Sequence, residues 1–245
     1  MAKVRLDQLL VTRGLAPSRA RAQALVLAGE VSVSGSRVDK VGTLVTEDAP
    51  IEVRAPDHPY VSRGGVKLAG ALDAFGLDVK GLRCLDLGAS TGGFTDCLLQ
   101  RGAARVIAVD VGYGQLAHAL RVDPRVVVME RTNARTLEPD VIGGAADLTV
   151  VDASFIGLGK LATAIARCTR KGGELVALVK PQFEVGREQA ARARGVVRDE
   201  AVRAAAIDAA IHELVAAGFD LIARRDSVLP GPKGNREAFV HARRV

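Results

Sequence analysis

The stretch of sequence that decides the fold is Cys84-Leu85-Asp86-Leu87-Gly88-Ala89-Ser90-Thr91-Gly92-Gly93. The apolar segment 83–87 is expected to form a strand that leads into this glycine-rich turn, and the helical pattern of 95–101 follows it. Glycines let a backbone turn tightly and approach a ligand closely. The spacing Asp-x-Gly-x-x-x-Gly differs from the Gly-x-Gly-x-x-Gly of nicotinamide dinucleotide sites, so the turn predicts a different ligand.

Strands and helices alternate along the chain beyond this turn. The other strands are expected at 105–110, 125–130, 147–152, 174–180, 220–227 and 237–242, and the other helices at 67–75, 161–169 and 200–217. Such alternation predicts an α/β fold with a mostly parallel, doubly wound sheet. A turn rich in proline and glycine joins the last two strands, so they are expected to form a hairpin that makes the seventh strand antiparallel.

The composition limits the class of protein. Hydrophobic residues make up 48% and aromatic residues 3% of the chain, which predicts an aliphatic core. The three cysteines, Cys84, Cys97 and Cys168, lie in apolar runs and match neither a disulfide framework nor a metal site. The N-terminus has no apolar signal segment and no run is long enough to span a membrane, so a cytoplasmic protein without a membrane partner is expected.

The first part of the chain is expected to be a separate, basic unit. Residues 1–55 predict two helices, at 5–11 and 19–27, followed by short strands at 31–33 and within 43–53. Residues 1–42 carry seven Lys and Arg against three Asp and Glu, a large share of the net charge of +6. Such concentration favours a phosphate-binding face. We therefore expect a small α+β domain over 1–55, a linker over 56–63 and the larger α/β domain over 64–245.

Several residues of the first unit resemble the alpha-L RNA-binding motif of small-subunit ribosomal proteins and pseudouridine synthases. The resemblance rests on Arg5-Leu6-Asp7, Arg13-Gly14, Ser18-Arg19, Gly29, Val31, Gly35 and Lys40. It implies an RNA-binding domain in which the second helix and the hairpin face RNA. The residues expected at RNA, including one beyond the motif, are Arg5, Ser18, Arg19, Arg21, Lys40 and Arg63. A solvated surface charge is the alternative for each arginine taken alone.

The turn after the first strand resembles the first motif of the Rossmann-like class I methyltransferases, whose sheet has seven strands with the last antiparallel. The resemblance implies S-adenosylmethionine as cofactor; a copy of the fold that binds no cofactor is the alternative. Asp110 ends the second strand, where a carboxylate can accept both ribose hydroxyls. Thr132 and Asn133 follow the third strand, near the expected adenine, although Asn133 could equally form a turn. The expected cofactor residues are Asp86, Gly88, Ala89, Ser90, Thr91, Gly92, Gly93, Asp110, Thr132 and Asn133.

The fourth strand leads into Asp152-Ala153-Ser154-Phe155. Amino-methylating enzymes usually carry Asn/Asp-Pro-Pro-Tyr/Phe at this point, and cytosine C5 enzymes need a cysteine after a proline. Neither pattern is present, so the acceptor is expected to be a hydroxyl. Lys180 ends the next strand and is expected to point into the ligand crevice, although an ordinary strand-end lysine is the alternative.

Lys67, Asp152, Lys180 and Glu237 match, in order, the Lys-Asp-Lys-Glu set of FtsJ-type RNA 2′-O-ribose methyltransferases. The whole chain resembles the TlyA (hemolysin-A) family of ribosomal RNA 2′-O-methyltransferases. The stretches that carry this resemblance include 61–64, 88–95, 111–116, 130–135, 179–186 and 229–235.

The resemblance to these families implies methylation of cytidine ribose in the small or in both ribosomal subunits, with ribosomal RNA or subunits as partners. In the catalytic hypothesis, Lys180 is the base or orients the hydroxyl, Asp152 fixes Lys180, and Lys67 and Glu237 hold the substrate ribose. The alternatives are a non-catalytic RNA-binding ribosome-assembly factor and a membrane-active hemolysin.

Overall fold

The computed structural model describes residues 3–16, 18–53, 58–185, 195–231 and 233–245. The chain divides into two compact units, Met1–Pro59 and Tyr60–Val245. This boundary falls inside the segment that the sequence marks as a linker, of which residues 56 and 57 lie outside the described part.

The first unit contains two helices and short antiparallel strands around one small core. The helices are α1 (Leu6–Thr12) and α2 (Arg19–Ala28), and the strands are β1 (Lys3–Arg5), β2 (Val31–Val33), β3 (Ser36–Arg37), β4 (Leu44–Thr46) and β5 (Ile51–Val53). Ser18 caps α2 by accepting a hydrogen bond from the amide of Arg21. Apolar side chains of both helices and of β2 and β4 form the core, among them Leu6, Leu10, Val26, Val31 and Val45.

The single strand expected within 43–53 is two strands that belong to different sheets. β4 pairs with β1, which the sequence analysis did not predict, and β5 pairs with β2. A turn after Thr46 separates them, and the Arg13 guanidinium holds it by donating to the carbonyls of Glu47 and Ala49. A partner distant in sequence therefore stabilises the break between the two strands.

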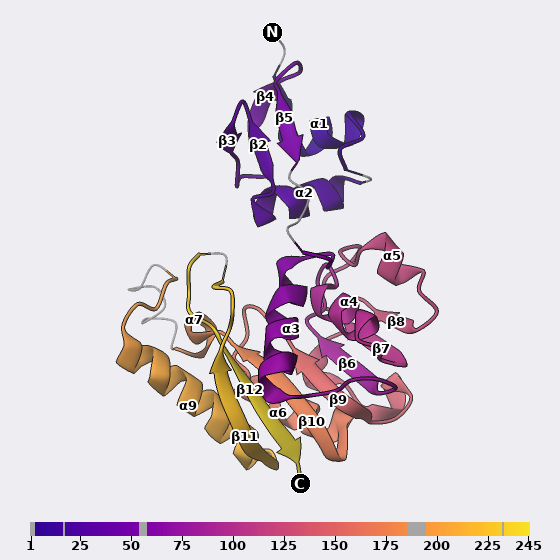
Figure 1. The fold of residues 1–245 in the computed structure, drawn as a ribbon, viewed down its shortest axis with the longest axis vertical. Coiled ribbons are helices and arrows are strands. Elements are labelled where there is room, and N and C mark those ends of the chain that lie inside the picture. The colour runs from indigo at the N-terminus through magenta and orange to yellow at the C-terminus, as the bar shows by residue number, and fades with distance from the viewer. Residues whose placement is uncertain (1–2, 17, 54–57, 186–194, 232) are drawn as a thin grey trace. The chain divides into compact units, whose positions relative to one another are not determined.

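The second unit is built on a mixed sheet that has seven strands in the described part of the chain (Figure 1). The strands are β6 (Arg83–Leu87), β7 (Arg105–Val109), β8 (Val126–Met129), β9 (Ala146–Val151), β10 (Thr169–Val179), β11 (Phe219–Asp226) and β12 (Ala238–Arg244). Their order is β11-β12-β10-β9-β6-β7-β8, and β12 runs antiparallel to both of its neighbours. The predicted fold class, with its antiparallel last strand, is confirmed.

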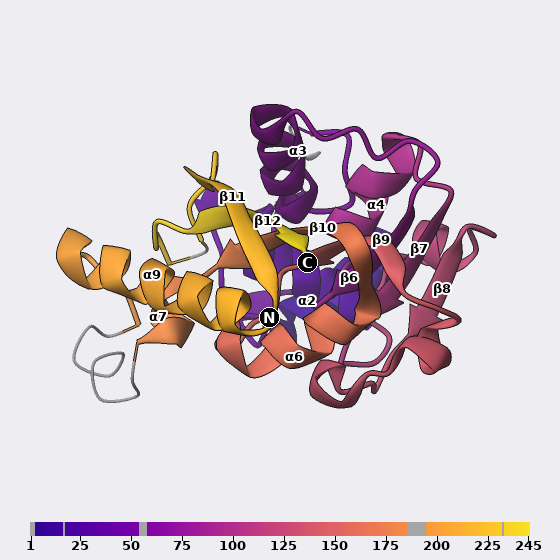
Figure 2. The ribbon, with the colours of Figure 1, turned by 90° about the horizontal axis from the view of Figure 1, so that it is seen from below.

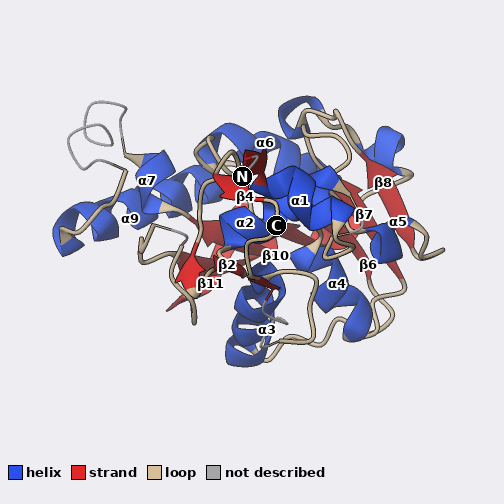
Figure 3. Cartoon of the chain, turned by 90° about the horizontal axis from the view of Figure 1, so that it is seen from above, coloured by secondary structure: helices blue, strands red, loops and turns tan. Residues whose placement is uncertain are grey.

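Helices cover both faces of this sheet. α3 (Arg63–Phe75) and α4 (Gly93–Gln100) lie on one face, and α6 (Gly159–Cys168) and α9 (Glu200–Ala216) lie on the other (Figures 2 and 3). Two aliphatic cores result, one beneath each helix pair. Successive strand residues contribute to the two cores in turn: in β10, Val176 and Leu178 face α3 and α4, whereas Ala177 and Val179 face α6 and α9.

α3 begins four residues before the expected position. Gly64 and Gly65 weaken the helical signal in the sequence, because glycine is a poor helix former. A Cβ atom at Gly65 would lie 2.3 Å from the ring of Tyr60, and one at Gly93 would lie 2.3 Å from the Ser62 hydroxyl. These glycines therefore allow α3 to begin in close contact with Tyr60 and with the first residue of α4.

Four short helical segments in loops were also not predicted from the sequence. Two of them, α5 (His118–Arg121) and α7 (Pro181–Glu184), are α-helical, and the 3₁₀ turns are Ala134–Thr136 and Pro139–Ile142. Segments of three or four residues carry too little periodicity to be recognised.

Candidate active site

Three of the four charged residues that the sequence singles out meet at one edge of the large sheet. Asp152 and Lys180 directly follow β9 and β10, and Glu237 directly precedes β12. Because β10 and β12 are antiparallel and pair Val179 with Ala238, Lys180 and Glu237 are the next residues in register. The N-terminal end of the antiparallel strand β12 therefore lies at the edge of the sheet where the parallel strands have their C-terminal ends.

Side-chain alternation places these residues on a common face. Lys180, Asp152 and Glu237 each lie two residues along the backbone from a side chain in the core beneath α3 and α4. Those core side chains are Leu178, Val150 and Phe239, respectively. Lys67 is a buried residue of α3 itself. The sheet and the helix therefore bring all four charged side chains to the same side of the molecule.

Lys180 and Asp152 form an ion pair. Nζ of Lys180 lies 2.6 Å from Oδ1 of Asp152, and its hydrogen bonds go to Oγ of Ser154 at 2.8 Å and to the carbonyl of Asp152 at 3.4 Å. The Lys180 side chain is 10% exposed, whereas that of Asp152 is 25% exposed. The ammonium is thus held in a fixed position by the segment that follows β9.

Lys67 and Glu237 form a second ion pair, with 2.5 Å between Nζ and Oε2. Their side chains are only 9% and 1% exposed. A pair so deeply buried must be satisfied internally, because either charge alone would lack water. The structure thus separates the four residues into two pairs, and Lys67 and Glu237 contact each other.

The glycine-rich turn lies directly against the segment that follows β9 and begins with Asp152. Gly88 has φ +87°, and a Cβ atom there would lie 2.8 Å from the carbonyl oxygen of Asp152. The amides of Gly88 and Ala89 both donate to the carbonyl of Val109 at the end of β7, and Thr91 accepts from the amide of Ala117. Glycine is required at this point because the turn and the residue that holds Lys180 are in backbone contact.

Asp86 is fully buried beneath this turn. Its Oδ2 accepts a hydrogen bond of 2.6 Å from Thr95 of α4, and its Oδ1 has no hydrogen-bond partner among the described residues. Burial raises the pKa of Asp86 to about 7, and the nearby carboxylates of Asp152 and Asp110 contribute to the rise. Three carboxylates are therefore concentrated at this edge of the sheet.

Asp110 connects two loops at the end of β7. Its carboxylate accepts from the amide of Ser90 at 2.8 Å and from that of Gly112 at 2.6 Å, and its own carbonyl accepts from the amide of Thr132. Ser90 has φ +48°, an uncommon value for a residue with a side chain. Asn133 is different: it is exposed, and its side chain caps a 3₁₀ turn by accepting from the amide of Arg135. Asn133 thus has the turn-forming role that the sequence left open.

The arginines of the first unit are engaged in structure as well as exposed. Asp7 is fully buried and accepts from Arg5, Arg19 and Gln23, and the Arg5 guanidinium holds the pKa of Asp7 far below its usual range. The side chains of Arg5 and Arg19 are nevertheless 40% and 52% exposed. Lys40 is exposed, and in the second unit Arg63 is the first residue of α3.

Two residues of the segment that follows Asp152 were given no role from the sequence. Ser154 supplies the hydroxyl that accepts from the Lys180 ammonium, and its position two residues after Asp152 was the available signal. Phe155 follows with φ +67°, and its side chain is 91% exposed, with its ring 5.4 Å from that of Phe183. An aromatic ring left open to solvent in a strained backbone is a candidate for ligand contact.

Comparison with known proteins identifies relatives of this chain. Residues 60–244 match the model of the FtsJ-like methyltransferases, and residues 4–51 match the S4 domain. The chain is 49% identical over 242 residues to the 16S/23S rRNA (cytidine-2′-O)-methyltransferase TlyA of Mycobacterium tuberculosis, covering 98% of this chain and 90% of that protein. It is 39% identical to the Hemolysin A of Brachyspira hyodysenteriae, covering 97% of this chain and 99% of that protein.

Solved structures agree with the fold. A protein from Streptococcus thermophilus has 40% identity and a TM-score of 0.78, covering 100% of this chain and 90% of that chain. A methyltransferase from Mesorhizobium loti has 19% identity and a TM-score of 0.53, which is a likeness of fold alone. Within the described residues, no helix has both the length and the apolar character needed to cross a bilayer.

Proposed function

The chain belongs to the FtsJ-like methyltransferase family, and from this premise we propose that it methylates the ribose 2′-hydroxyl of a cytidine in ribosomal RNA, with S-adenosylmethionine as methyl donor. Its relatives named TlyA, which are 49% and 36% identical to it, carry that activity in their names. An enzyme that modifies ribosomal RNA must be in the compartment that contains ribosomes, so the proposal includes a cytoplasmic location.

One observation carries the proposal. Asp152, whose side chain forms the ion pair with Lys180, contacts the glycine-rich turn through its backbone. The contact is so close that Gly88 has no room for a side chain against the Asp152 carbonyl. The group that would act on the hydroxyl and the turn that would hold the methyl donor are therefore held in one rigid arrangement. Methyl transfer needs such alignment of oxygen, methyl carbon and sulfur.

The charges at the sheet edge suit the cofactor. S-adenosylmethionine carries a sulfonium and an ammonium group and, when bound, would supply an activated methyl group. Asp110 and Asp152 provide negative charge at this edge. Burial raises the pKa of Asp86 to about 7, and its buried Oδ1 atom, which has no partner among the described residues, has capacity for one further hydrogen bond. The residues proposed to hold the cofactor are Asp86, Gly88, Ala89, Ser90, Thr91, Gly92, Gly93, Asp110 and Thr132, with Asn133 beside them as the cap of the next turn.

The two ion pairs supply the groups that the reaction needs. In the proposal, Lys180 holds the 2′-oxygen in line, while Asp152 keeps Lys180 in position. As a base, Lys180 would take the hydroxyl proton in its neutral form; as an ammonium, it would only orient the hydroxyl, whose proton would then pass to water. Lys67 and Glu237 would bind the ribose beside them, exchanging part of their mutual contact for contacts with the sugar. In this assignment the protein mainly aligns the reactants, because the activated methyl group is already electrophilic.

The first unit is proposed to bind the RNA. It matches the S4 domain, and its Ser18, Arg19, Arg21 and Lys40 come from the α2 region and the β3–β4 segment. Arg5 and, from the second unit, Arg63 complete the proposed set. Basic side chains of this kind neutralise phosphates without reading sequence.

The proposal is tested by incubating ribosomal subunits with the full chain and isotopically labelled S-adenosylmethionine, followed by mass spectrometry of the nucleosides. Labelled 2′-O-methylcytidine is expected with the wild-type protein, and its loss with Lys180→Met, a substitution that keeps the length of the stem but removes the ammonium. Lys80→Met, on an exposed turn before β6, is the matched control. Tight RNA binding with no label would favour an assembly factor, and lysis of vesicles with no label would favour a hemolysin.

A further inference from the structure

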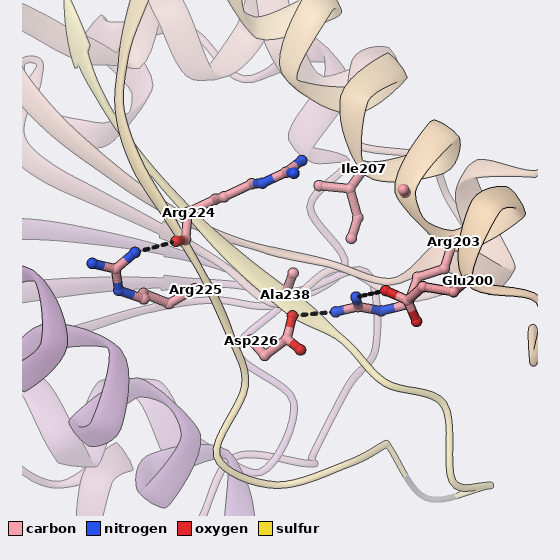
Figure 4. Close-up of a pocket in the computed structure, with 8 residues that line it drawn as sticks. Glu200, Arg203, Ile207, Arg224, Arg225, Asp226 and Ala238 are labelled. Atoms are coloured by element: carbon pink, nitrogen blue, oxygen red, sulfur yellow. Dashed lines mark hydrogen bonds and ion pairs between the residues drawn. The ribbon is translucent and has the colours of Figure 1, made fainter.

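A network of charged side chains surrounds the start of β12 on the face opposite Lys67. It consists of Glu200 and Arg203 of α9, Asp226 at the end of β11, and Arg236, the residue before Glu237. Arg203 donates to Glu200 at 2.7 Å and also to Asp226 (Figure 4). Arg236 donates to the other oxygens of the same two carboxylates, at 2.9 Å each.

Arg203 makes one contact that the rest of the network does not make. Its Nε donates a hydrogen bond of 2.9 Å to the backbone carbonyl of Arg236. On the other side of Glu237, the amide of Ser227 donates to the carbonyl of Glu237, also at 2.9 Å. The carbonyls on either side of the Glu237 Cα atom, those of Arg236 and Glu237, therefore each accept a hydrogen bond, which holds the backbone from which its side chain projects.

The space around the Glu237 carboxylate is equally restricted. A Cβ atom at Gly231 would lie 2.5 Å from Oε1 of Glu237, while Oε2 lies 2.5 Å from Nζ of Lys67. The carboxylate is thus enclosed between a backbone and an ammonium. A small rotation of the backbone at residue 237 would separate it from Lys67.

We propose that Arg203 is a positioning residue for Glu237: from the α9 face it fixes the backbone from which Glu237 projects toward Lys67 on the α3 face. The inference rests on the proposed function, since it assumes that Glu237 contributes to methyl transfer. Arg203 itself, on the opposite face of the sheet, is not expected to touch substrate or cofactor.

The burial of Arg203 supports this role. Its side chain is 7% exposed, whereas that of Arg236 is 62% exposed, yet both bind the same two carboxylates. Glu200 and Asp226 would still be paired with Arg236 if the Arg203 guanidinium were removed. Burying a guanidinium is costly, and a pair of this kind is weak evidence for stability. The contribution that depends on Arg203 alone is the hydrogen bond to the carbonyl next to Glu237.

The test compares Arg203→Met with Arg224→Met in the full chain. Methionine keeps the apolar stem of either arginine and removes the guanidinium. Arg224 and Arg203 line one pocket together with Glu200 and Asp226 (Figure 4). The Arg224 guanidinium donates to Asp208 at 2.6 Å rather than to the carbonyl of Arg236, so its substitution also removes an ion pair. For Arg203→Met we expect kcat for 2′-O-methylation to fall on the order of tenfold to a hundredfold, with the KM for S-adenosylmethionine unchanged. Arg224→Met is expected to keep the wild-type kcat.

A double-mutant cycle separates positioning from a general structural role. If Arg203 acts through Glu237, Arg203→Met should cause little further loss in a Glu237→Gln background, whereas an independent effect would multiply the two losses. Independent losses, or wild-type kcat in Arg203→Met, would overturn the inference. Should Arg203→Met fail to fold, Arg203→Lys serves in the same cycle, because its ammonium can still donate to the carbonyl and a smaller, equally non-additive loss is expected.

The same measurements distinguish failure of the inference from failure of the proposed function. Wild-type protein that labels no ribosomal RNA, or a Glu237→Gln variant with full activity, would contradict the proposed function and with it the role of Arg203. Activity that depends on Glu237 and is unaffected by Arg203→Met would overturn the inference alone.

Discussion

Glu237 and Lys67 illustrate how a single buried contact can serve two purposes. Both side chains are removed from water, and each is the charge partner of the other. Their attraction must first offset the cost of desolvating both ions, so the pair contributes little net stability even though neither member can be lost alone. The proposed use of the pair in binding ribose explains why the chain keeps two charges where apolar side chains would suffice.

Removing one member of this pair should therefore destabilise the protein more than removing both. We expect Lys67→Met to lower the free energy of unfolding by about 3–5 kcal/mol, because Glu237 would be left buried without a partner. The double variant Lys67→Met/Glu237→Met should recover most of that loss and remain without methylation activity. Denaturant unfolding and the nucleoside assay measure the two effects, and a double variant no more stable than the single one would contradict the explanation.

Asp86 predicts a dependence of stability on pH. Its pKa is raised from 3.8 to about 7 by burial, so between these values the folded state holds a proton that the unfolded state has lost. This group therefore favours folding most at low pH, and its contribution declines as the pH rises from about 4 to 7. The wild-type protein should therefore lose stability as the pH rises from 5 to 8, whereas Asp86→Asn should not. The difference between their free energies of unfolding should shift in favour of the variant by on the order of a few kcal/mol over this range.

Denaturant unfolding at the two pH values measures this difference. Thr95→Val is a control that removes the hydrogen bond to Asp86 but keeps the ionisable group. If the stabilities of Asp86→Asn and wild type changed in parallel with pH, the carboxyl would not titrate in this range.

At the scale of elements, close backbone contacts decide where α3 begins and thus where Lys67 lies. Lys67 is only two residues from Gly65, which lies against Tyr60. The helix also meets the first residue of α4, through Ser62 and Gly93. The position of a catalytic candidate therefore depends on the absence of side chains at neighbouring positions.

Two alanine substitutions in the same helical turn test this dependence. Gly65→Ala should destabilise the fold by about 1–3 kcal/mol, because its methyl group would collide with the Tyr60 ring. Gly64→Ala is the matched control: the nearest atom to its Cβ would be 3.4 Å away, and alanine is the better helix former. Thermal unfolding of both variants measures the difference, and equal midpoints would contradict the packing argument.

At the scale of the whole molecule, the chain combines a basic unit with an enzyme unit. Nucleic-acid affinity that comes from phosphate contacts falls as the salt concentration rises. The slope of the logarithm of affinity against the logarithm of salt concentration is set by the number of contacts. We expect Arg21→Gln and Lys40→Gln each to reduce that slope by about 0.7–0.9 for a ribosomal RNA fragment. Binding measured between low and physiological salt checks this, with Lys80→Gln as control. Unchanged slopes would place the RNA contacts elsewhere.

Much of the fold and most of the candidate site followed from the sequence alone. The strand over 83–87 and the start of α9 were placed at the observed residues, because buried strands and capped helices have strong local patterns. β1, the division of 43–53 into β4 and β5, and the early start of α3 were missed. In each case a deciding partner is distant in sequence: Val45 for β1, Arg13 for the turn, and Gly93 for α3.

The sequence by itself determined the order of strands and helices, the glycine-rich turn and the identities of the four charged residues, because these depend on local periodicity and on motif spacing. The hypothesis from the sequence already placed Asp152 beside Lys180, but only the tertiary structure decided that Lys67 and Glu237 contact each other. Strand register sets Lys180 beside Glu237, but α3 takes Lys67 to Glu237 and leaves Lys180 with Asp152. Nor does the sequence show that Arg203, on the opposite face, holds the backbone of Glu237. Such contacts arise from the packing of helices on a sheet, which no spacing along the chain encodes.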